Sequence, residues 1–441
     1  MNIQLLFDKA KEAGFSASEV YRVTVDSIEV GVTDATVKKH QISSSDAICF
    51  RGLMNGKMGY ASTEKISDES IEQLIINAKD SALLIEKDDQ EFIYSGDGQY
   101  VDVVAGSSVE FDTQFYIDTT LDVEQAILKT SDKIVKVADT QMKHMQKTTY
   151  IANSNGLEVK QYASNAMLFS SPVAKDGDGM VNAYDFAKGV DYTAIDIDKF
   201  VKTAVKNTLQ KVDAKPMKSG LTKVIFSNKV MASLLGIMSG NFNADVMQEG
   251  RSKLEGLEGQ KIANELITIV DNPHLENSFS SCGFDDEGVP TYKKNIVDNG
   301  TFTGFLHNLK TANKAGVKTT GNAKKAGVTS PIKVGTTNLY LQTGESELEE
   351  MILAVGNGVF VTEMDGGHSG ANAVTGDFSL PIRGLLIEDG KLTTPVKQVT
   401  MAANFFEVLK NVVAVGDDFE TTHMGAGSPS VSVGEISIAG E

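Results

Sequence analysis

Apolar positions near the start of the chain follow two periods in turn, first a helical one and then a strict alternation. Residues 3–13 carry apolar side chains at helical spacing, and Gly14 follows at a point where glycine commonly ends a helix. The alternating run YRVTVDSIEVGVTD is typical of a strand. The pair Asn55-Gly56 suits the positive φ angles of a two-residue hairpin turn, and Ser67 is placed to cap a second helix. These elements predict one α+β domain.

The next block repeats this order of elements. We expect a helix over residues 121–139, strands over residues 145–175 that turn at Asn155-Gly156, and a further helix over residues 196–214. The echo of the first block fits an internal duplication. It equally fits the common rhythm of helices and strands in α+β proteins.

Beyond residue 215, short strand patterns and glycine-containing turns dominate. TKVIFSN is typical of a strand, and Ser227 or Asn228 then opens the helix KVMASLLGIMS. Two similar hairpins are expected in NIVDNGTFTGFL and LLIEDGKLTTPV, one turning at an Asn-Gly pair and one at an Asp-Gly pair. Ser346 and Glu349 match the S-x-x-E capping box before ELEEMILAVGNG.

The predicted fold class is α+β, with an N-terminal helix/strand region followed by a β-rich C-terminal domain. We expect three parts: an N-terminal α+β domain over residues 1–95, a central α+β region over residues 96–215, and the β-rich domain over residues 216–441. Two charged stretches are expected at the surface of the last part. The basic run at residues 310–327 is predicted to be a mobile loop, with covering of an anionic ligand or substrate as the alternative. The acids at residues 285–298 are predicted to lie in solvated turns, because a calcium loop would need denser oxygen ligands.

The charge balance narrows the classes of partner. The chain has 41 Lys and Arg against 59 Asp and Glu, a formal net charge of -18. A groove that follows phosphates needs a positive field, so we expect no nucleic acid partner and no anionic membrane partner. No apolar run approaches the roughly 20 residues that span a bilayer. Cys49 and Cys282 are far apart in sequence, and a chain of this size needs no disulfide to be stable. We therefore expect a cytoplasmic protein without a disulfide.

The search for catalytic motifs finds little. None of the six histidines stands four or five residues from another, and the chain has no CxxC site, P-loop or GxSxG elbow. One local feature is MDGGHSGANAVTGDFSLP, in which Asp365 and His368 are close enough in sequence to reach each other. Another is the glycine-rich HMGAGSPSVSVGE over residues 423–435. Each fits a tight loop, and each also fits a ligand-binding loop whose backbone N–H groups face outward.

Several short stretches together resemble the TldD/PmbA family over nearly the full chain. These stretches are GRS (250–252), DDEGVPT (285–291), VDNGTFTGF (297–305), GNAKKAG (321–327), TTNLYLQTG (336–344), VTGDFS (374–379), IEDGKLTTPVK (387–397) and GSPSVSVG (427–434). The TldD line of this family resembles a zinc metallopeptidase with an HExxxH motif and a cysteine ligand near the C-terminus. The PmbA line, also called TldE, lacks that site and is the companion subunit. The older family name, modulator of DNA gyrase, implies no function for this acidic sequence.

The resemblance places the lost zinc motif on this chain. Counting back from GRS, the first histidine falls on Leu235, the glutamate on Gly236 and the second histidine on Gly240, while the cysteine falls on Met424. None of these side chains is a good zinc ligand, and neighbouring His423 alone does not rebuild a three-ligand site. Ligands five residues apart also need a π-type bulge, which this helix has no metal reason to form.

The resemblance therefore implies a catalytically inactive, non-metal subunit of a zinc peptidase that processes peptides or unfolded segments. Zinc is expected in a TldD-like partner and no cofactor in this chain. The C-terminal domain is expected to dimerise, with a homodimer when the chain is alone. Two glycine-rich loops are candidates to border the substrate cavity; their residues are Gly366, Gly367, His368, Gly425 and Gly427. The alternatives are an autonomous hydrolase built around Asp365 and His368, and a homodimeric peptide-binding protein without a peptidase partner.

Overall fold

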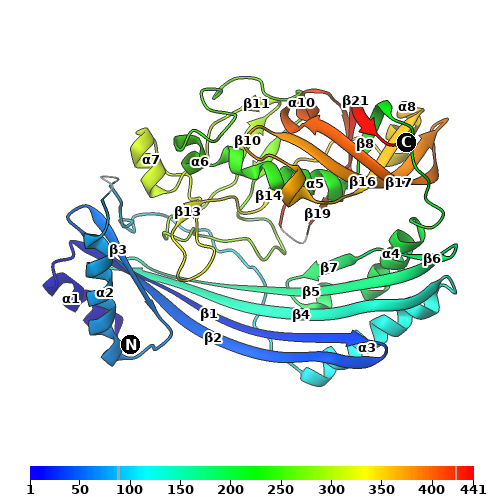
Figure 1. The fold of residues 1–441 in the computed structure, drawn as a ribbon. Helices are drawn as coiled ribbons and strands as arrows, with labels where there is room; N and C mark the ends of the chain where they lie inside the picture. The colour runs from blue at the N-terminus through cyan, green and yellow to red at the C-terminus, as the bar shows by residue number, and fades with distance from the viewer. Residues whose placement is uncertain (87–89, 423–424) are drawn as a thin grey trace.

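The computed structural model describes residues 1–86, 90–422 and 425–441. Four long strands of the N-terminal half form a curved sheet, and the C-terminal domain lies over one face of it (Figure 1). Helices α1 and α2 lie at one end of this sheet, and α3 and α4 at the other. The mixture of helices with many strands, and the β-rich C-terminal part, confirm the predicted α+β class.

The long sheet has seven strands, in the order β3-β2-β1-β4-β5-β6 with β7 beside β5. β1 pairs antiparallel with β4, so strands from residues 17–63 and from residues 134–189 share one sheet. The predicted boundary near residue 95 stays a prediction. The elements of this half are α1 (Ile3–Glu12), β1 (Ala17–Thr33), β2 (Thr36–Met54), β3 (Lys57–Thr63), η1 (Asp68–Ser70), α2 (Ile71–Leu83), α3 (Thr113–Thr130), β4 (Ile134–Asn153), β5 (Glu158–Asp176), β6 (Gly179–Asn182), β7 (Asp185–Gly189), η2 (Tyr192–Ala194) and α4 (Ile197–Leu209).

The C-terminal domain contains a ring of strands. β17, β16, β15, β8 and β21 are neighbours in that order, and β17 also pairs with β21, which closes the ring. None of these five strands is left as an edge strand, so they offer no open edge to support the dimerisation expected of the C-terminal domain. The elements are β8 (Gly220–Phe226), α5 (Asn228–Met238), η3 (Ser239–Phe242), α6 (Ala244–Gln248), β9 (Ile269–Asp271), β10 (Lys294–Asp298), β11 (Thr301–Phe302), α7 (Leu309–Ala315), β12 (Ala323–Lys324), β13 (Lys333–Val334), β14 (Leu339–Leu341), α8 (Leu348–Val355), β15 (Gly358–Met364), α9 (Gly367–Gly370), β16 (Asp377–Glu388), β17 (Lys391–Asn404), α10 (Phe405–Lys410), β18 (Val412–Val415), β19 (Glu420–Thr421), β20 (Gly427–Ser428) and β21 (Val431–Ala439).

The turns predicted from asparagine or aspartate before glycine are confirmed. Asn55 has φ 52° and Gly56 φ 77°, the positive pair that a type I′ hairpin turn requires. The hairpins β10–β11 and β16–β17 turn in the same way at residues 299–300 and 389–390. The side chain of Ser227 accepts a hydrogen bond from the N–H of Val230, so the predicted cap of α5 is confirmed as well.

The helix predicted over residues 121–139 is wrong in its second half. α3 ends at Thr130, and β4 begins at Ile134. Ile134 and Val137 are buried in the core between the sheet and helices α3 and α4, where pairing with β5 fixes an extended backbone. Tertiary pairing here outweighs a local pattern that fits a helix equally well.

Two predicted caps are also wrong. Ser67 precedes the short helix η1 but makes no capping hydrogen bond with its side chain. Ser346 lies one residue too early for a capping box, because α8 begins at Leu348 after Glu347. The backbone of Ser346 instead forms an isolated β-bridge with Gly416. No helix in the described ranges is both long enough and apolar enough to cross a membrane.

Candidate functional site

The resemblance places the lost zinc motif on α5, at Leu235 and Gly236, and on the following turn η3, at Gly240. Leu235 is 0% exposed and belongs to the main core of the C-terminal domain. Gly236 and Gly240 lie instead on the half-buried side of this segment, together with Ile237. The α-helix ends at Met238 and continues as the 3-10 turn η3, so residues 228–242 contain no π-type bulge.

Two glycine-rich segments lie against this side of α5. A Cβ added at Gly236 would lie 3.4 Å from the Cβ of Ala426, and one added at Gly367 would lie 2.5 Å from Cδ1 of Ile237. The structure thus brings the lost-motif helix, the 366–370 segment and the 425–428 segment together. Met424 and His423 lie outside the described residues.

The predicted site residues in these two segments have separate local roles. Gly366, at φ 71°, precedes the four-residue helix α9, and Gly425, at φ 92°, lies in a turn. Gly427 is buried in β20, where a Cβ would come 2.7 Å from the ring of Phe419. At Gly366 and Gly425 the positive φ itself favours glycine, and at Gly427 close packing does so.

Asp365 and His368 do not form a pair. Both are exposed, and within the described residues no hydrogen bond or ion pair joins them. The N–H of Asp365 donates to the carbonyl of Pro381, which ties this residue to β16. The two side chains therefore give no sign of the acid/base arrangement that an autonomous hydrolase would need.

A cavity of about 430 Å³ lies between the central region and the C-terminal domain, next to α5. Its walls come from α4 and β7 on one side and from α5, β15, β16 and β19 on the other. Lys229, Val230 and Ser233 of α5 line it, and so does Asp365. Apolar side chains line it as well, among them Phe186 of β7.

Ion pairs link the two sides of this cavity. Nζ of Lys229 lies 2.9 Å from Oδ1 of Asp185, and Nζ of Lys211 lies 2.7 Å from Oε2 of Glu363. Lys188 of β7 donates to the carbonyl of Thr422 at 2.6 Å, and burial lowers the pKa of this lysine. The arrangement holds the walls together around a mixed polar and apolar space, which suits binding better than chemistry.

The residues at the lost-motif positions do not fit a zinc ion. The side chains of Leu235, Gly236 and Gly240 offer no lone pair to a metal and no base to activate a water. Across the described ranges, no group of three or more His, Cys, Asp and Glu side chains is arranged to hold a metal.

The predicted solvated turns are wrong for Asp285 and Glu287, which are buried, whereas the prediction is confirmed for Asp298, which is exposed at the turn between β10 and β11. Asp285 is 2% exposed and Glu287 is 4% exposed. Oδ1 of Asp285 accepts hydrogen bonds from the N–H groups of Glu287 and Val289, and Oδ2 accepts one from Ala323. These three backbone hydrogen bonds fix the loop around Asp285 and offset the desolvation cost of its buried carboxylate.

Glu287 joins a buried ion cluster that crosses from the C-terminal domain to the long sheet. Its Oε1 lies 3.6 Å from Nη1 of Arg51 in β2, and its Oε2 accepts the N–H of Leu309 at 2.9 Å. Nε of Arg51 donates to Oε1 of Glu19 in β1 at 2.6 Å. We call Glu19, Arg51 and Glu287 the interdomain ion cluster. Desolvation raises the pKa of both carboxyl groups above its ordinary value.

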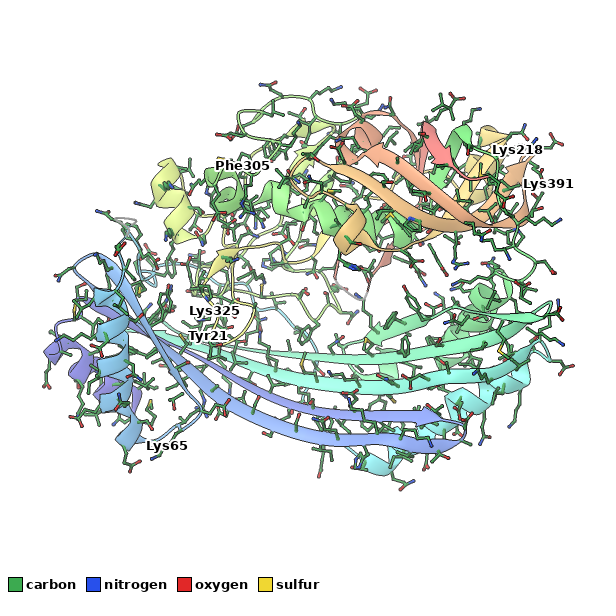
Figure 2. All side chains as sticks on the ribbon, in the orientation of Figure 1. Tyr21, Lys65, Lys218, Phe305, Lys325 and Lys391 are labelled. Atoms are coloured by element: carbon green, nitrogen blue, oxygen red, sulfur yellow. The ribbon has the colours of Figure 1, made fainter. Side chains whose placement is uncertain are left out.

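The basic run at residues 310–327 contains regular structure and contacts the long sheet, which corrects the predicted mobile loop. It includes most of α7 and all of β12. Nζ of Lys325 lies 5.1 Å from the ring centre of Tyr21, and the two side chains approach each other between the sheet and the C-terminal domain (Figure 2). The hydroxyl of Tyr21 donates to Asp286 at 2.9 Å. These residues hold the two domains together, and no local signal in the sequence reveals it.

Comparison with known proteins confirms the resemblance. The model of the PmbA/TldA metallopeptidase C-terminal domain matches residues 219–440. The models of the central domain and of domain 1 match residues 107–212 and 18–82. Metalloprotease PmbA of Escherichia coli O157:H7 is 26% identical over 450 residues, which cover 98% of this chain and 96% of the relative. A metalloprotease of Methanothermobacter thermautotrophicus is 30% identical over 312 residues, covering 67% of this chain and 68% of the relative.

Solved structures agree with these matches. A putative modulator of a DNA gyrase from Thermotoga maritima superposes with a TM-score of 0.92 at 26% identity, covering 99% of both chains. TldE from Thermococcus kodakarensis superposes with a TM-score of 0.92 at 22% identity, again over 99% of both chains, and this second likeness shows the fold alone. The chain therefore belongs to the PmbA/TldD family of metallopeptidases.

Proposed function

We propose that this chain is the non-metal subunit of a TldD/TldE-type zinc metallopeptidase, inactive by itself, which completes the dimer and the substrate cavity. The observation that carries the proposal is the segment formed by α5 and η3, where Gly236 and Gly240 have no side chain and Leu235 is buried in the core. A zinc peptidase needs ligands and a base at such positions. In this proposal the zinc-bearing paralogue supplies both.

The role proposed for this chain is to hold peptides or unfolded segments near α5. The support is the cavity of about 430 Å³ beside that helix, with its mixed polar and apolar walls. Gly366, Gly367, His368, Gly425 and Gly427 are proposed to border the substrate, because the segments that carry them lie at the same helix. An extended peptide can bind there through backbone contacts and shallow side-chain pockets.

We also propose that the chain pairs with itself when the paralogue is absent, and that it acts in the cytoplasm. The support for pairing is a long free edge: β3 covers only the second part of β2, and residues 36–47 have no neighbour on that side within the described chain. Exposed strand edges of this length favour association. The support for the compartment is the acidic composition and the two unpaired cysteines.

Reconstituted cleavage tests the proposal. Casein and short peptides are incubated with this chain alone, with a TldD-type paralogue alone and with both, in each case with and without a chelator. We expect no cleavage by this chain alone, and cleavage by the mixture that the chelator abolishes. His368→Ala is expected to leave the rate of chemistry unchanged and to weaken substrate binding by about 0.5–1.5 kcal/mol at most, the value of one neutral hydrogen bond.

The opposite result favours the autonomous hydrolase. Chelator-resistant cleavage by this chain alone, lost in His368→Ala, would overturn the proposal. A mixture that cleaves no faster than the paralogue alone, together with tight peptide binding by this chain, would instead favour a peptide-binding protein without a peptidase partner.

A further inference from the structure

A second cavity, of about 450 Å³, lies outside the site described above. One wall is the edge of β5 at residues 159–162, and the other is the extended segment at residues 100–106. The two walls meet at one end, where Ala105 forms a parallel bridge with Ala163 and the N–H of Ser164 donates to the carbonyl of Ala105 at 2.8 Å. From that end the walls run side by side and enclose the cavity. We call this space the β5 slot.

The edge of β5 presents unpaired backbone groups to the slot. Backbone N–H and C=O groups of a strand point alternately to its two sides, and the N–H of Ser164 points away from β4. The register between β4 and β5 is continuous from residue 158 to residue 170. The backbone groups of Lys160 and the N–H of Tyr162 therefore point into the slot, and within the described chain no hydrogen bond reaches them from outside the sheet, whereas the carbonyl of Tyr162 faces Ala105 in the parallel bridge.

The opposite wall is held at both ends and unpaired between them. The hydroxyl of Tyr100 donates to the carbonyl of Gly288 at 2.8 Å, and its ring packs edge-on against Phe284. At the other end, Gln146 bonds both the N–H and the carbonyl of Val109. Between these anchors, no hydrogen bond within the described chain reaches the backbone of residues 101–104.

Two valines on this wall are unusually open to solvent. Val101 is 51% exposed and Val104 is 76% exposed. Branched apolar side chains are favoured where they pack on a pleated surface, and here such packing is incomplete. The slot thus combines free backbone groups on both walls with apolar side chains that lack full cover.

We propose that the β5 slot binds an extended peptide segment of about four residues, which enters as an added strand and pairs with both walls through its backbone. The proposal rests on the substrate-holding role proposed above and gives that role a second place on the chain. Exposed Lys160 and Asp102 carry opposite charges, so the walls favour no strongly charged sequence. Recognition through the backbone suits unfolded substrates of varied sequence.

Backbone methylation of a probe peptide tests the pairing. The probe is a fluorescein-labelled hexapeptide of alternating valine and threonine, and binding to the full chain without the paralogue is followed by fluorescence anisotropy. A single N-methyl group is placed at each position in turn. Because successive N–H groups of the bound segment face opposite walls, we expect each of the roughly four positions inside the slot to lose affinity by about tenfold, as expected for losing one backbone hydrogen bond, and the positions outside the slot to change little. Small losses at every position, or losses confined to every second position, would overturn pairing with both walls.

Blocking the slot tests its location. In Val104→Cys the new thiol lines the slot, and a bulky maleimide attached to it is expected to abolish binding of the probe. The control is Val413→Cys with the same label; Val413 is 66% exposed, lies on β18 in a different sheet and does not line the slot. The native cysteines are buried and unpaired, so they compete little for the reagent.

The outcomes separate this inference from the proposed function. Equal binding by both labelled variants, or no binding of the probe by the native chain, would overturn the slot. If the label at position 104 abolishes binding and the paralogue still gains no activity from this chain, the slot stands and the companion role fails. If the mixture cleaves peptides with the slot blocked and the probe bound elsewhere, the companion role stands and the slot fails.

Discussion

Removing the guanidinium of Arg51 perturbs the interdomain ion cluster directly. The side chain is 2% exposed, and it joins Glu19 in the same sheet to Glu287 in the C-terminal domain. Arg51→Met keeps an unbranched apolar stem of similar course but leaves the carboxylate of Glu19, which is 0% exposed, without its cation. Breaking a buried pair in this way typically costs about 3–5 kcal/mol.

The magnitude can be worked out from protonation. The variant can avoid a lone buried charge by protonating Glu19, whose ordinary pKa is about 4.3. At pH 7 that costs about 3.7 kcal/mol relative to the unfolded chain, and at pH 5 about 1 kcal/mol, because each unit is worth 1.36 kcal/mol. Because desolvation already raises the pKa of Glu19 in the native chain, this cost is an upper bound, and we expect Arg51→Met to lose up to about 4 kcal/mol of unfolding free energy at pH 7 and markedly less at pH 5.

Urea unfolding at both pH values measures this loss. The chain has no tryptophan, so far-UV circular dichroism and tyrosine fluorescence serve as the two probes, and coincident transitions would support a two-state treatment. The control is the double variant Glu19→Gln with Arg51→Met, which carries no buried charge at that pair. It is expected to recover part of the lost stability, since replacing both partners is commonly far less costly than removing one.

Two results would refute this reasoning. A loss below about 1 kcal/mol at pH 7 would mean that the cluster is open to water and worth no more than a surface pair. An equal loss at pH 5 and pH 7 would mean that protonation of Glu19 does not relieve the variant, so the cost would come from packing alone.

Three further predictions concern stability. Desolvation raises the folded pKa of Glu287, so its contribution to the unfolding free energy is complete below its unfolded pKa of about 4.3 and is lost as pH rises through the folded pKa. Glu287→Gln should therefore reduce the decrease of the unfolding free energy with pH, measured by urea unfolding at several pH values. The same decrease with pH in the variant and the native chain would contradict this prediction. Leu235→Ala should cost about 2–5 kcal/mol by opening a cavity, whereas Leu353→Ala, at a side chain 69% exposed, should cost little; equal losses would show that α5 is not packed as described. Gly288→Ala should lower the melting temperature more than Gly56→Ala does. Both glycines have positive φ, but only at Gly288 would an added Cβ clash with the side chain of Leu157. Equal shifts in melting temperature would argue against that contact.

Some turns and helix caps of this fold could be predicted from the local sequence alone. An asparagine before a glycine predicts a hairpin turn because both residues tolerate positive φ, and the turn at Asn55-Gly56 needs nothing else. The cap at Ser227 is equally local. The strand at Ile134 could not be predicted, because pairing with β5 and packing against α3 and α4 decide between helix and strand there.

The residues of the candidate site could likewise be predicted only in part. The sequence shows which side chains stand at each position, so the proposal that Gly236 and Gly240 replace zinc-site residues could be made from the resemblance alone. The burial of Glu287 could not, because its partner Arg51 comes from a sheet more than two hundred residues earlier in the chain. A run of acids has the same local pattern whether it faces water or an arginine of another domain.

The central claim is that this chain holds no catalytic metal and works with a subunit that does. Zinc analysis combined with native mass spectrometry tests it most directly, on this chain alone, on a TldD-type paralogue alone and on their mixture, all without histidine tags and after dialysis. The account predicts no stoichiometric zinc on this chain and a one-to-one complex whose zinc belongs to the paralogue. About one tightly held zinc per copy of this chain, or no complex in the mixture, would contradict it.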